Sequence, residues 1–192
     1  MSDARADGTL RLTCQPSKAG NVLIFPYTLA NQGAGDVYAV HALPSEAAPN
    51  ETAAIVIAGD SGDAIVGKFA TPLPTDRRIL VPVAPLARRL PAGAKLEGRI
   101  EITLPLAETS PYFSDLTLRQ YEIVEINGLI VMIGYWPAET TDLVARPAPD
   151  APDLLTILTA DPVGSAKLVS QRFPTHGLQL FRRTDAFPRG FE

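Results

Sequence analysis

The segment that decides the fold reads YEIVEINGLIVMIGYW, residues 121–136. Two runs rich in β-branched and aromatic residues flank Asn127-Gly128, and Asn-Gly between such runs is the strongest short-range signal for a two-residue hairpin turn. We therefore expect a β-hairpin from about Leu118 to Trp136. The turn sets a register with these facing pairs: Ile126 with Leu129, Val124 with Val131, Ile123 with Met132, and Tyr121 with Gly134.

Short apolar runs separated by Pro and Gly continue through the rest of the chain. The 192 residues include 18 prolines and 14 glycines, a composition that predicts many turns and little helix. The first strand candidates, around Leu10, over 21–30 and over 37–43, resemble the opening strands of many immunoglobulin-like sandwiches. We expect an all-β, immunoglobulin-like antiparallel β-sandwich with an extra C-terminal strand and arm region. Further strand candidates cover 53–58 and 64–70, which form a hairpin, then 78–83, 154–159, 166–173 and 178–182.

The clearest single strand is expected over 95–106, because its residues alternate strictly in character. One face carries Leu96, Ile100, Ile102, Leu104 and Leu106 together with Gly98, and the other carries Lys95, Glu97, Arg99, Glu101 and Thr103. The alternation predicts that the first face is buried in the core and that the second faces solvent.

The chain divides into four regions by composition. Residues 1–8 are small and charged and predict a flexible N-terminus, and residues 9–137 form the sandwich. The stretch 138–152 is rich in Pro, Ala and Asp and predicts a long connection. Residues 153–192 contain additional strands and an extended C-terminal arm. They are too few for an independent core, so we expect them to pack on the same domain.

Charge and composition disfavour several classes of partner. The net charge is −4 and the sequence pI is about 5.2, so the chain has no positive field to attract nucleic acid or an anionic membrane. No apolar run approaches the ~20 residues that a membrane-spanning helix needs. The single cysteine, Cys14, and an N-terminus without an apolar signal region predict a protein of the reducing cytoplasm.

One short motif is similar to a catalytic signature. The segment Gly59-Asp-Ser-Gly-Asp63 resembles the Gly-Asp-Ser-Gly-Gly signature of trypsin-like serine proteases, in which Ser61 would be the nucleophile. Asp63 replaces the last glycine, His41 is the only histidine upstream, and the segment lies in the first third of the chain. We therefore expect a tight turn here, and no enzymatic activity.

Metal sites are not expected either. A copper site of the blue-copper kind would gather Cys, His and Met in one loop, whereas the candidate ligands are scattered over Cys14, His41, Met132 and His176. Pairs of turn aspartates supply too few oxygens for Ca²⁺. We expect no cofactor, Cys14 as a small core residue, and the histidines as solvated or capping groups.

Aromatic residues are more informative than the polar motifs. Tyr112 and Phe113 lie in a loop before the expected hairpin, and Tyr135 and Trp136 lie at its exit. If the two pairs meet at one end of the sandwich, they form a flat apolar platform suited to sugar rings or partner side chains. The alternative is that Trp136 and Tyr112 close the end of the core.

The C-terminus interleaves aromatic residues with arginines, the residue types that are enriched at interface hot spots. Pro188 and Gly190 predict an extended arm, which either folds back on its own sheet or docks on another subunit. The residues of this arm that could bind a partner are Phe181, Arg182, Arg183, Phe187, Arg189 and Phe191.

The sequence therefore predicts a non-catalytic protein–protein interaction or assembly module, an accessory or structural subunit of the kind found in bacterial machines. Edge strands and the C-terminal arm would contact another protein or a second copy of the chain. The alternative is a small-ligand or carbohydrate-binding sandwich that uses the aromatic platform. An enzyme with a site assembled from dispersed residues is a third possibility, in which Ser61, His41 and an acid would meet in space.

Overall fold

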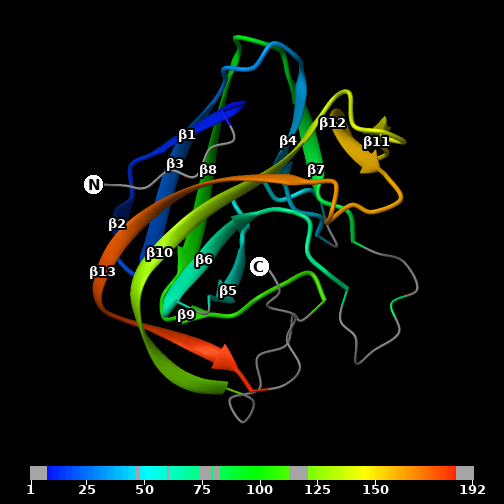
Figure 1. The fold of residues 1–192 in the computed structure, drawn as a ribbon. Helices are drawn as coiled ribbons and strands as arrows, with labels where there is room; N and C mark the ends of the chain where they lie inside the picture. The colour runs from blue at the N-terminus through cyan, green and yellow to red at the C-terminus, as the bar shows by residue number, and fades with distance from the viewer. Residues whose placement is uncertain are drawn as a thin grey trace.

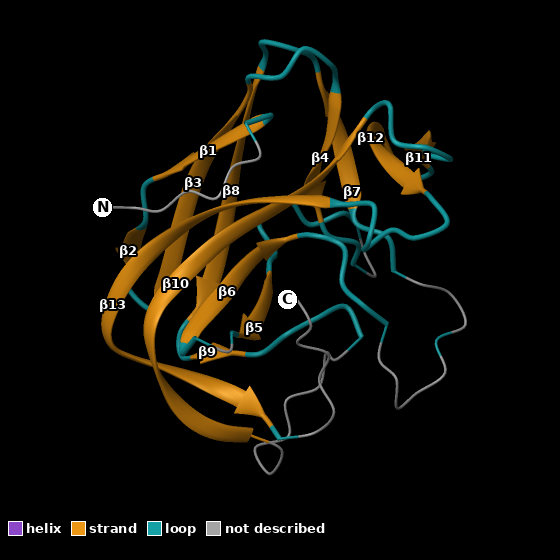
Figure 2. Cartoon of the chain, in the orientation of Figure 1, coloured by secondary structure: helices purple, strands orange, loops and turns teal. Residues whose placement is uncertain are grey.

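In a computed structural model the chain is an all-β protein with two sheets (Figures 1 and 2). The structure describes residues 8–45, 48–59, 61–73, 79, 83–112 and 121–184. These residues contain no helix, and so none that could cross a membrane. The strands are β1 (Leu10–Cys14), β2 (Ser17–Ala19), β3 (Val22–Asn31), β4 (Val37–Ala42), β5 (Ile55–Ala58), β6 (Asp63–Lys68), β7 (Leu86–Leu90), β8 (Lys95–Thr103), β9 (Leu106–Ala107), β10 (Tyr121–Pro137), β11 (Val144–Ala148), β12 (Ala151–Leu158) and β13 (Lys167–Arg183).

The first sheet is built around β3, which pairs with β1 and β2 along one edge and with β8 along the other. The second sheet has the order β11-β12-β7-β4-β10-β13-β9, and the predicted hairpin β5–β6 joins it because β6 also pairs with β10. The predicted alternation of β8 is confirmed, since Ile100 is buried and Lys95, Glu97 and Arg99 are exposed. Leu106 lies beyond the end of β8, in the second sheet.

The longest strands correct the central prediction. Asn127-Gly128 is not a hairpin turn, because β10 runs through it without reversing (Figure 1). A type I′ turn needs positive φ at both central residues, and neither Asn127 nor Gly128 has one. The strand instead pairs over almost its whole length with β13, antiparallel, so that Val124 lies opposite Leu180 and Val131 lies opposite Gln171. The expected facing pairs within 121–136 are therefore wrong.

Asn127-Gly128 forms a β-bulge, which shifts the alternation of β10 by one residue. Ile126 and, after the bulge, Leu129, Val131 and Ile133 all belong to the shared core. Without the extra residue, the two halves of the strand would bury opposite faces. β13 contains a matching irregularity between Pro174 and Leu178, where Gly177 adopts a φ of 66°. The two predicted strands 166–173 and 178–182 are thus one strand.

The bulge is held by an ion pair that spans β10. Asp63 of β6 lies beside Gly128, and Arg172 of β13 reaches it from the opposite side. The guanidinium donates two hydrogen bonds to the carboxylate, from Nε to Oδ2 at 2.7 Å and from Nη2 to Oδ1 at 2.8 Å. A Cβ at Gly128 would lie 2.8 Å from both Arg172 Nη2 and Asp63 Oδ1. Glycine is therefore required here for close approach, and the ion pair joins three strands.

The region 138–152, expected as a connection, contains strands. β11 lies within this region and forms an antiparallel hairpin with β12, in which Val144 lies opposite Leu158 and Ala148 opposite Ala151. The prolines fit because β11 is an edge strand, where a missing N–H is tolerated at the unpaired side. β12 continues to Leu158 and pairs with β7, so it belongs to the second sheet. Of the candidate strand 78–83, only Ile79 and Val83 lie within the described residues.

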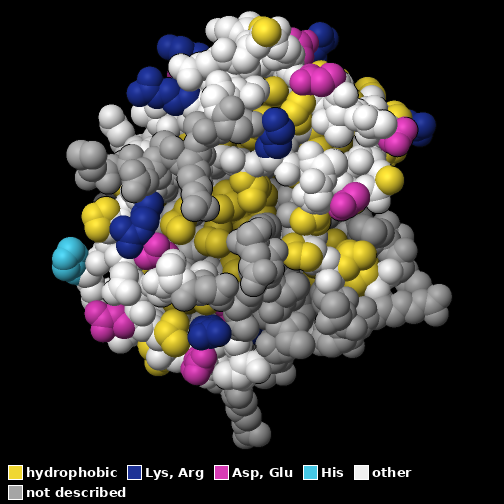
Figure 3. All heavy atoms as spheres, viewed as in Figure 1, with side chains coloured by type: hydrophobic (Ala, Val, Ile, Leu, Met, Phe, Trp, Pro, Cys, Tyr) yellow, Lys and Arg dark blue, Asp and Glu magenta, His cyan; other side chains and the backbone are white. Residues whose placement is uncertain are grey.

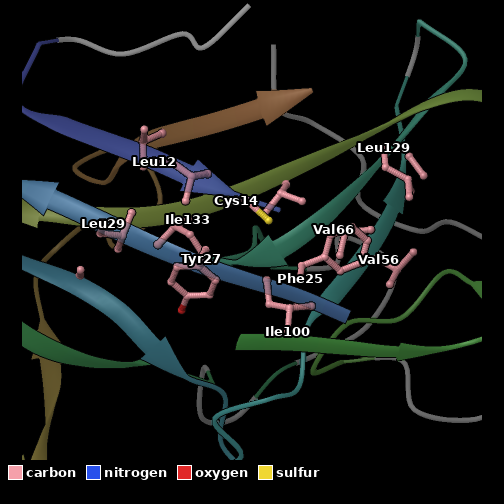
Figure 4. Packing of buried hydrophobic residues seen from close by; sticks show 14 of the residues in the cluster. Leu12, Cys14, Phe25, Tyr27, Leu29, Val56, Val66, Ile100, Leu129 and Ile133 are labelled. Atoms are coloured by element: carbon pink, nitrogen blue, oxygen red, sulfur yellow. The ribbon is translucent and has the colours of Figure 1, made fainter. Parts of the chain in front are cut away.

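A shared core lies between the two sheets. Figure 4 shows Leu12, Phe25 and Leu29 of the first sheet packed with Val66 and Ile133 of the second. Tyr27 of β3 lies opposite Gly98 of β8, and a Cβ at Gly98 would come within 2.3 Å of the tyrosine ring. An aromatic ring that covers a cross-strand glycine is a recurrent packing pair. It occurs here between Tyr27 and Gly98, and not between Tyr121 and Gly134, which the expected hairpin would have placed opposite each other.

The second sheet is also covered on its other face. One cluster there contains Ile55, Ile57, Ile65 and Phe69, and a second contains Trp136 and Ile157. β5 and β6 are therefore buried on both faces, which explains the continuous apolar runs 55–58 and 64–66. Figure 3 shows apolar side chains near the middle of the face in view.

We predict that Gly128→Ala destabilises the protein by about 1–3 kcal/mol, because the new methyl group displaces the Arg172 guanidinium from Asp63. Urea unfolding of the variant measures this cost. In an Arg172→Met background the same substitution should cost less, since no ion pair remains to be displaced. Equal costs in the two backgrounds would show that the ion pair does not fix the bulge.

The ion pair also predicts a pH dependence. The hydrogen bonds that Asp63 accepts from Arg172 lower the pKa of Asp63 below the usual 3.8. Stabilisation from the charged carboxylate is therefore fully present above about pH 4 and is lost as the pH falls through the lowered pKa. In unfolding experiments from pH 6 to pH 2.5, the stability difference between the wild type and Asp63→Asn should be constant above about pH 4 and shrink below it. A difference that stays constant throughout would contradict the pairing.

Candidate functional site

A large cavity lies over Trp136 on the outer face of the second sheet. It has a volume of about 700 Å³ and is lined mainly by apolar residues from the stretches 70–73, 83–85 and 157–163, together with Tyr112 and Trp136. They include Leu73, Val83, Tyr112, Trp136, Ile157 and Val163. We call it the Trp136 cavity. Its volume lies within the ~300–1,000 Å³ typical of ligand sites. Leu73 and Leu158, both in its lining, are 46% and 44% exposed.

The expected aromatic platform is only partly assembled. Tyr112 and Trp136 do line one cavity, as the platform requires, and the Tyr112 hydroxyl accepts a hydrogen bond from the Val83 N–H at 3.1 Å. Tyr135, however, points to the opposite face of β10 and is fully buried in the shared core. Adjacent residues of a strand face opposite ways, so Tyr135 and Trp136 cannot share a platform. Phe113 lies outside the described residues.

A second apolar surface lies where β10 begins and β13 ends. Ile123 is 58% exposed although it sits inside a paired strand, and its partner across the ladder is Phe181. Tyr121 lies next to them, with its ring 6.4 Å from that of Phe181 at an interplanar angle of 75°. We call Tyr121, Ile123 and Phe181 the ribbon end. Tyr121 and Phe181 also line a groove of about 660 Å³ with residues of β5 and β8.

The arginines of the expected arm have different environments. Arg183 is buried, its guanidinium lies 5.5 Å from the centre of the Tyr121 ring, and its backbone N–H donates to the buried carboxylate of Glu108 at 2.6 Å. The other oxygen of Glu108 accepts from the Ala58 N–H at 2.7 Å, so this carboxylate links β13 to β5. Arg182 is 41% exposed and pairs with Glu122. Phe181, Arg182 and Arg183 are therefore part of the sheet, whereas Phe187, Arg189 and Phe191 lie outside the described residues.

An unexpected charged group lies inside the sandwich. Lys68, at the end of β6, has no exposed surface, and its Nζ donates to the carbonyl oxygens of His41 at 2.9 Å and Arg99 at 3.0 Å. It also donates to the carbonyl of Glu51 and, at 3.3 Å, to the Tyr27 hydroxyl. We call this arrangement the Lys68 cage. It ties β6 to β4 and to β8, so it crosslinks the two sheets.

Burial shifts the pKa values of the ionisable groups in and around the Lys68 cage. Desolvation lowers the pKa of Lys68 to about 8, and the negative charge of Glu51 partly opposes this. Burial also raises the pKa of Tyr27, and that of the core thiol Cys14 to about 12. His41 is buried, which corrects its expected solvated position, and its Nε2 lies 3.1 Å from Glu51 Oε2. Desolvation, followed by the charge of Arg88, lowers the pKa of His41.

The protease-like motif forms a hairpin turn. Gly62 has a φ of 78°, and the Gly59 N–H donates to the Asp63 carbonyl at 2.8 Å, which closes the turn between β5 and β6. Asp63 is paired with Arg172 and also accepts a hydrogen bond from Ser61. His41 instead contacts Glu51. Asp63, which departs from the protease signature, is thus the residue of this segment that contacts a distant strand.

The four dispersed residues considered for copper lie in four different environments. Cys14 is a buried core residue, as expected, and Met132 packs on the outer cluster. His41 lies near the Lys68 cage, and His176 is exposed in the irregular part of β13. No group of three or more His, Cys, Asp or Glu side chains placed to hold a metal ion occurs in the part of the chain that the structure describes.

Sequence reasoning missed the Lys68 cage and the ribbon end. A signal for the cage existed, because Lys68 interrupts the apolar run 64–70 and a charge in a strand buried on both faces needs partners. The ribbon end had no local signal. It exists because β13 pairs with the first half of β10, which a hairpin within 121–136 would have prevented.

We predict that Lys68→Met destabilises the protein by about 3 kcal/mol, because three carbonyl oxygens lose their donor. Lys95→Met is the matched control, since Lys95 is exposed on β8. It should leave the free energy of unfolding almost unchanged. Equal stability of the two variants would show that the cage contributes nothing to holding the sheets together.

The chain was also compared with known proteins. No family model matches it, and no curated protein and no solved structure matches it either. The functional interpretation therefore rests on the geometry of the Trp136 cavity, the ribbon end and the Lys68 cage.

Proposed function

We propose that the protein is a non-catalytic protein–protein interaction module and that the ribbon end is its contact surface. The observation that carries this proposal is the exposure of Ile123, 58%, between two aromatic residues on paired strands. Burying such a side chain against a partner removes apolar surface from water. The loss of side-chain conformational entropy is small, because the side chain has few rotatable bonds. The adjacent groove of about 660 Å³ gives a partner side chain a place to insert.

Side-chain contacts are a better basis for recognition than strand addition. β9 has two residues and β11 has five, including Pro147, so both offer few free backbone groups. β8 is longer, but its solvent face carries alternating charges, and two of its backbone groups are occupied: Arg99 O by Lys68 and Glu101 N by Thr52 O. Short, charged or proline-containing edges discourage pairing with another chain. The contact is therefore made by the ribbon end, with the partner either another protein or a second copy.

We further propose that the two sheets form an elaborated immunoglobulin-like sandwich. The strand pairing supports this proposal, because β1-β3-β8 has the neighbour relations of strands A, B and E, and β4-β10-β13 those of strands C, F and G. The ribbon end then lies on the last two strands of the domain. β5, β6, β11 and β12 are additions to that plan.

Selection from a peptide library tests the contact surface without knowledge of the natural partner. Peptides that bind the wild-type chain should be rich in aromatic and aliphatic residues, and Ile123→Asp should weaken their binding about tenfold or more, because a charge replaces the central apolar side chain. Light scattering during size-exclusion chromatography of the same proteins shows whether a second copy is the partner.

The matched control is Val144→Asp. Val144 is also an exposed apolar residue on a strand, at 45% exposure, but it lies on β11, away from the ribbon end. This variant should keep peptide binding and any self-association. Peptides that bind Ile123→Asp as tightly as the wild type, together with an unchanged molecular mass, would refute the proposed surface.

A further inference from the structure

We propose that the Trp136 cavity is a separate binding site for a small, neutral and largely apolar molecule that carries a hydrogen-bond acceptor. The site lies on the outer face of the second sheet and is independent of the proposed protein contact at the ribbon end. Three properties of the cavity define the ligand: its size and lining, its charge, and an unsatisfied donor.

Size and lining indicate an apolar ligand. The volume of about 700 Å³ suits a small organic molecule. Trp136 and Ile157 are almost fully buried members of the lining, and Leu73 and Leu158 at its exposed end give access from solvent. Sugar recognition needs many hydrogen-bonding groups, whereas the described lining offers few polar side chains, Thr71, Thr159 and Asp161 among them. Carbohydrate is therefore a poor fit.

The charge of the described lining favours a neutral ligand over an anionic one. The described lining contains no Lys, Arg or His, so a carboxylate or phosphate would be desolvated there without a counter-charge. Among the lining residues that the structure describes, Asp161 is the only charged one, and its Oδ1 accepts the Gly164 N–H at 2.8 Å within a turn. The site thus favours a neutral molecule.

The indole of Trp136 supplies the third property. Trp136 is 1% exposed, and its Nε1–H has no hydrogen-bond partner among the described residues. Buried indole N–H groups usually have a partner, and an unsatisfied one costs free energy. Trp136 lines the cavity, so a carbonyl, ether or ester oxygen of a ligand that displaces the atoms now covering the indole N–H would accept this hydrogen bond. The donor therefore explains why the ligand carries an acceptor.

The single tryptophan of the chain makes the proposal directly testable. A ¹⁵N-labelled sample has one indole N–H resonance, which reports on the cavity. Acetophenone, benzoate and ethylbenzene have similar shapes but differ in charge and in the presence of a carbonyl. Acetophenone should shift the indole resonance downfield and saturably. Ethylbenzene should bind about tenfold more weakly, the loss expected for one hydrogen bond, and benzoate should not bind.

A cavity-filling variant assigns the shift to this site. Ala84 lines the cavity, so Ala84→Phe should abolish the acetophenone response, whereas Ala138→Phe, on an exposed turn outside the lining, should keep it. The amide spectrum shows whether each variant is folded, and the three-probe series decides the proposal in the wild type even if Ala84→Phe fails to fold. An indole resonance that does not respond, or that responds equally to benzoate, would overturn the proposal.

Discussion

The structure depends on the long antiparallel pairing of β10 with β13, and on the Asp63–Arg172 ion pair that crosses it at Gly128. β10 contacts more of the second sheet than a hairpin strand could, because β6 and β4 pair with successive parts of its other edge. The ion pair connects β6 and β13 across Gly128, where no side chain of β10 intervenes. A bidentate pair of this kind fixes geometry as well as adding stability.

The bulge at this point also determines which residues are available for function. Before it, Ile126 faces the core while Tyr121 and Ile123 face away. After it, Tyr135 faces the core while Trp136 faces away. The shift of one residue thus places the ribbon end and the floor of the Trp136 cavity on the same side of β10. A strand of strict alternation would have turned one of the two surfaces inward.

Local pattern predicted the local structure well. The alternation within 95–103, the hairpin 53–70 and the burial of Cys14 followed from residue type and spacing. Prediction failed where distant strands decided the outcome. Asn127-Gly128 has the residues of a type I′ turn, but its backbone never adopts positive φ, because every residue of β10 except Asn127 finds a pairing partner in one of three other strands. Tertiary pairing overrides local turn preference in such cases.

In the candidate sites, too, local features could be predicted from the sequence, and features that depend on distant strands could not. That Tyr112 and Trp136 share a cavity could be expected from the sequence, because both were placed near the ends of strands, whereas the assignment of Tyr135 to the core depended on the register of the bulge. The Lys68 cage draws on carbonyl oxygens from three separate segments. No local pattern encodes such convergence, because it is a property of how the two sheets meet.

Cross-strand nuclear Overhauser effects in a ¹⁵N,¹³C-labelled sample test the central claim most directly. The structure predicts backbone contacts between Val124 and Leu180 and between Val131 and Gln171, on both sides of the bulge. A hairpin at Asn127-Gly128 would instead give a contact between Val124 and Val131. Observation of that contact, without the pairs to β13, would contradict the register on which both proposed surfaces depend.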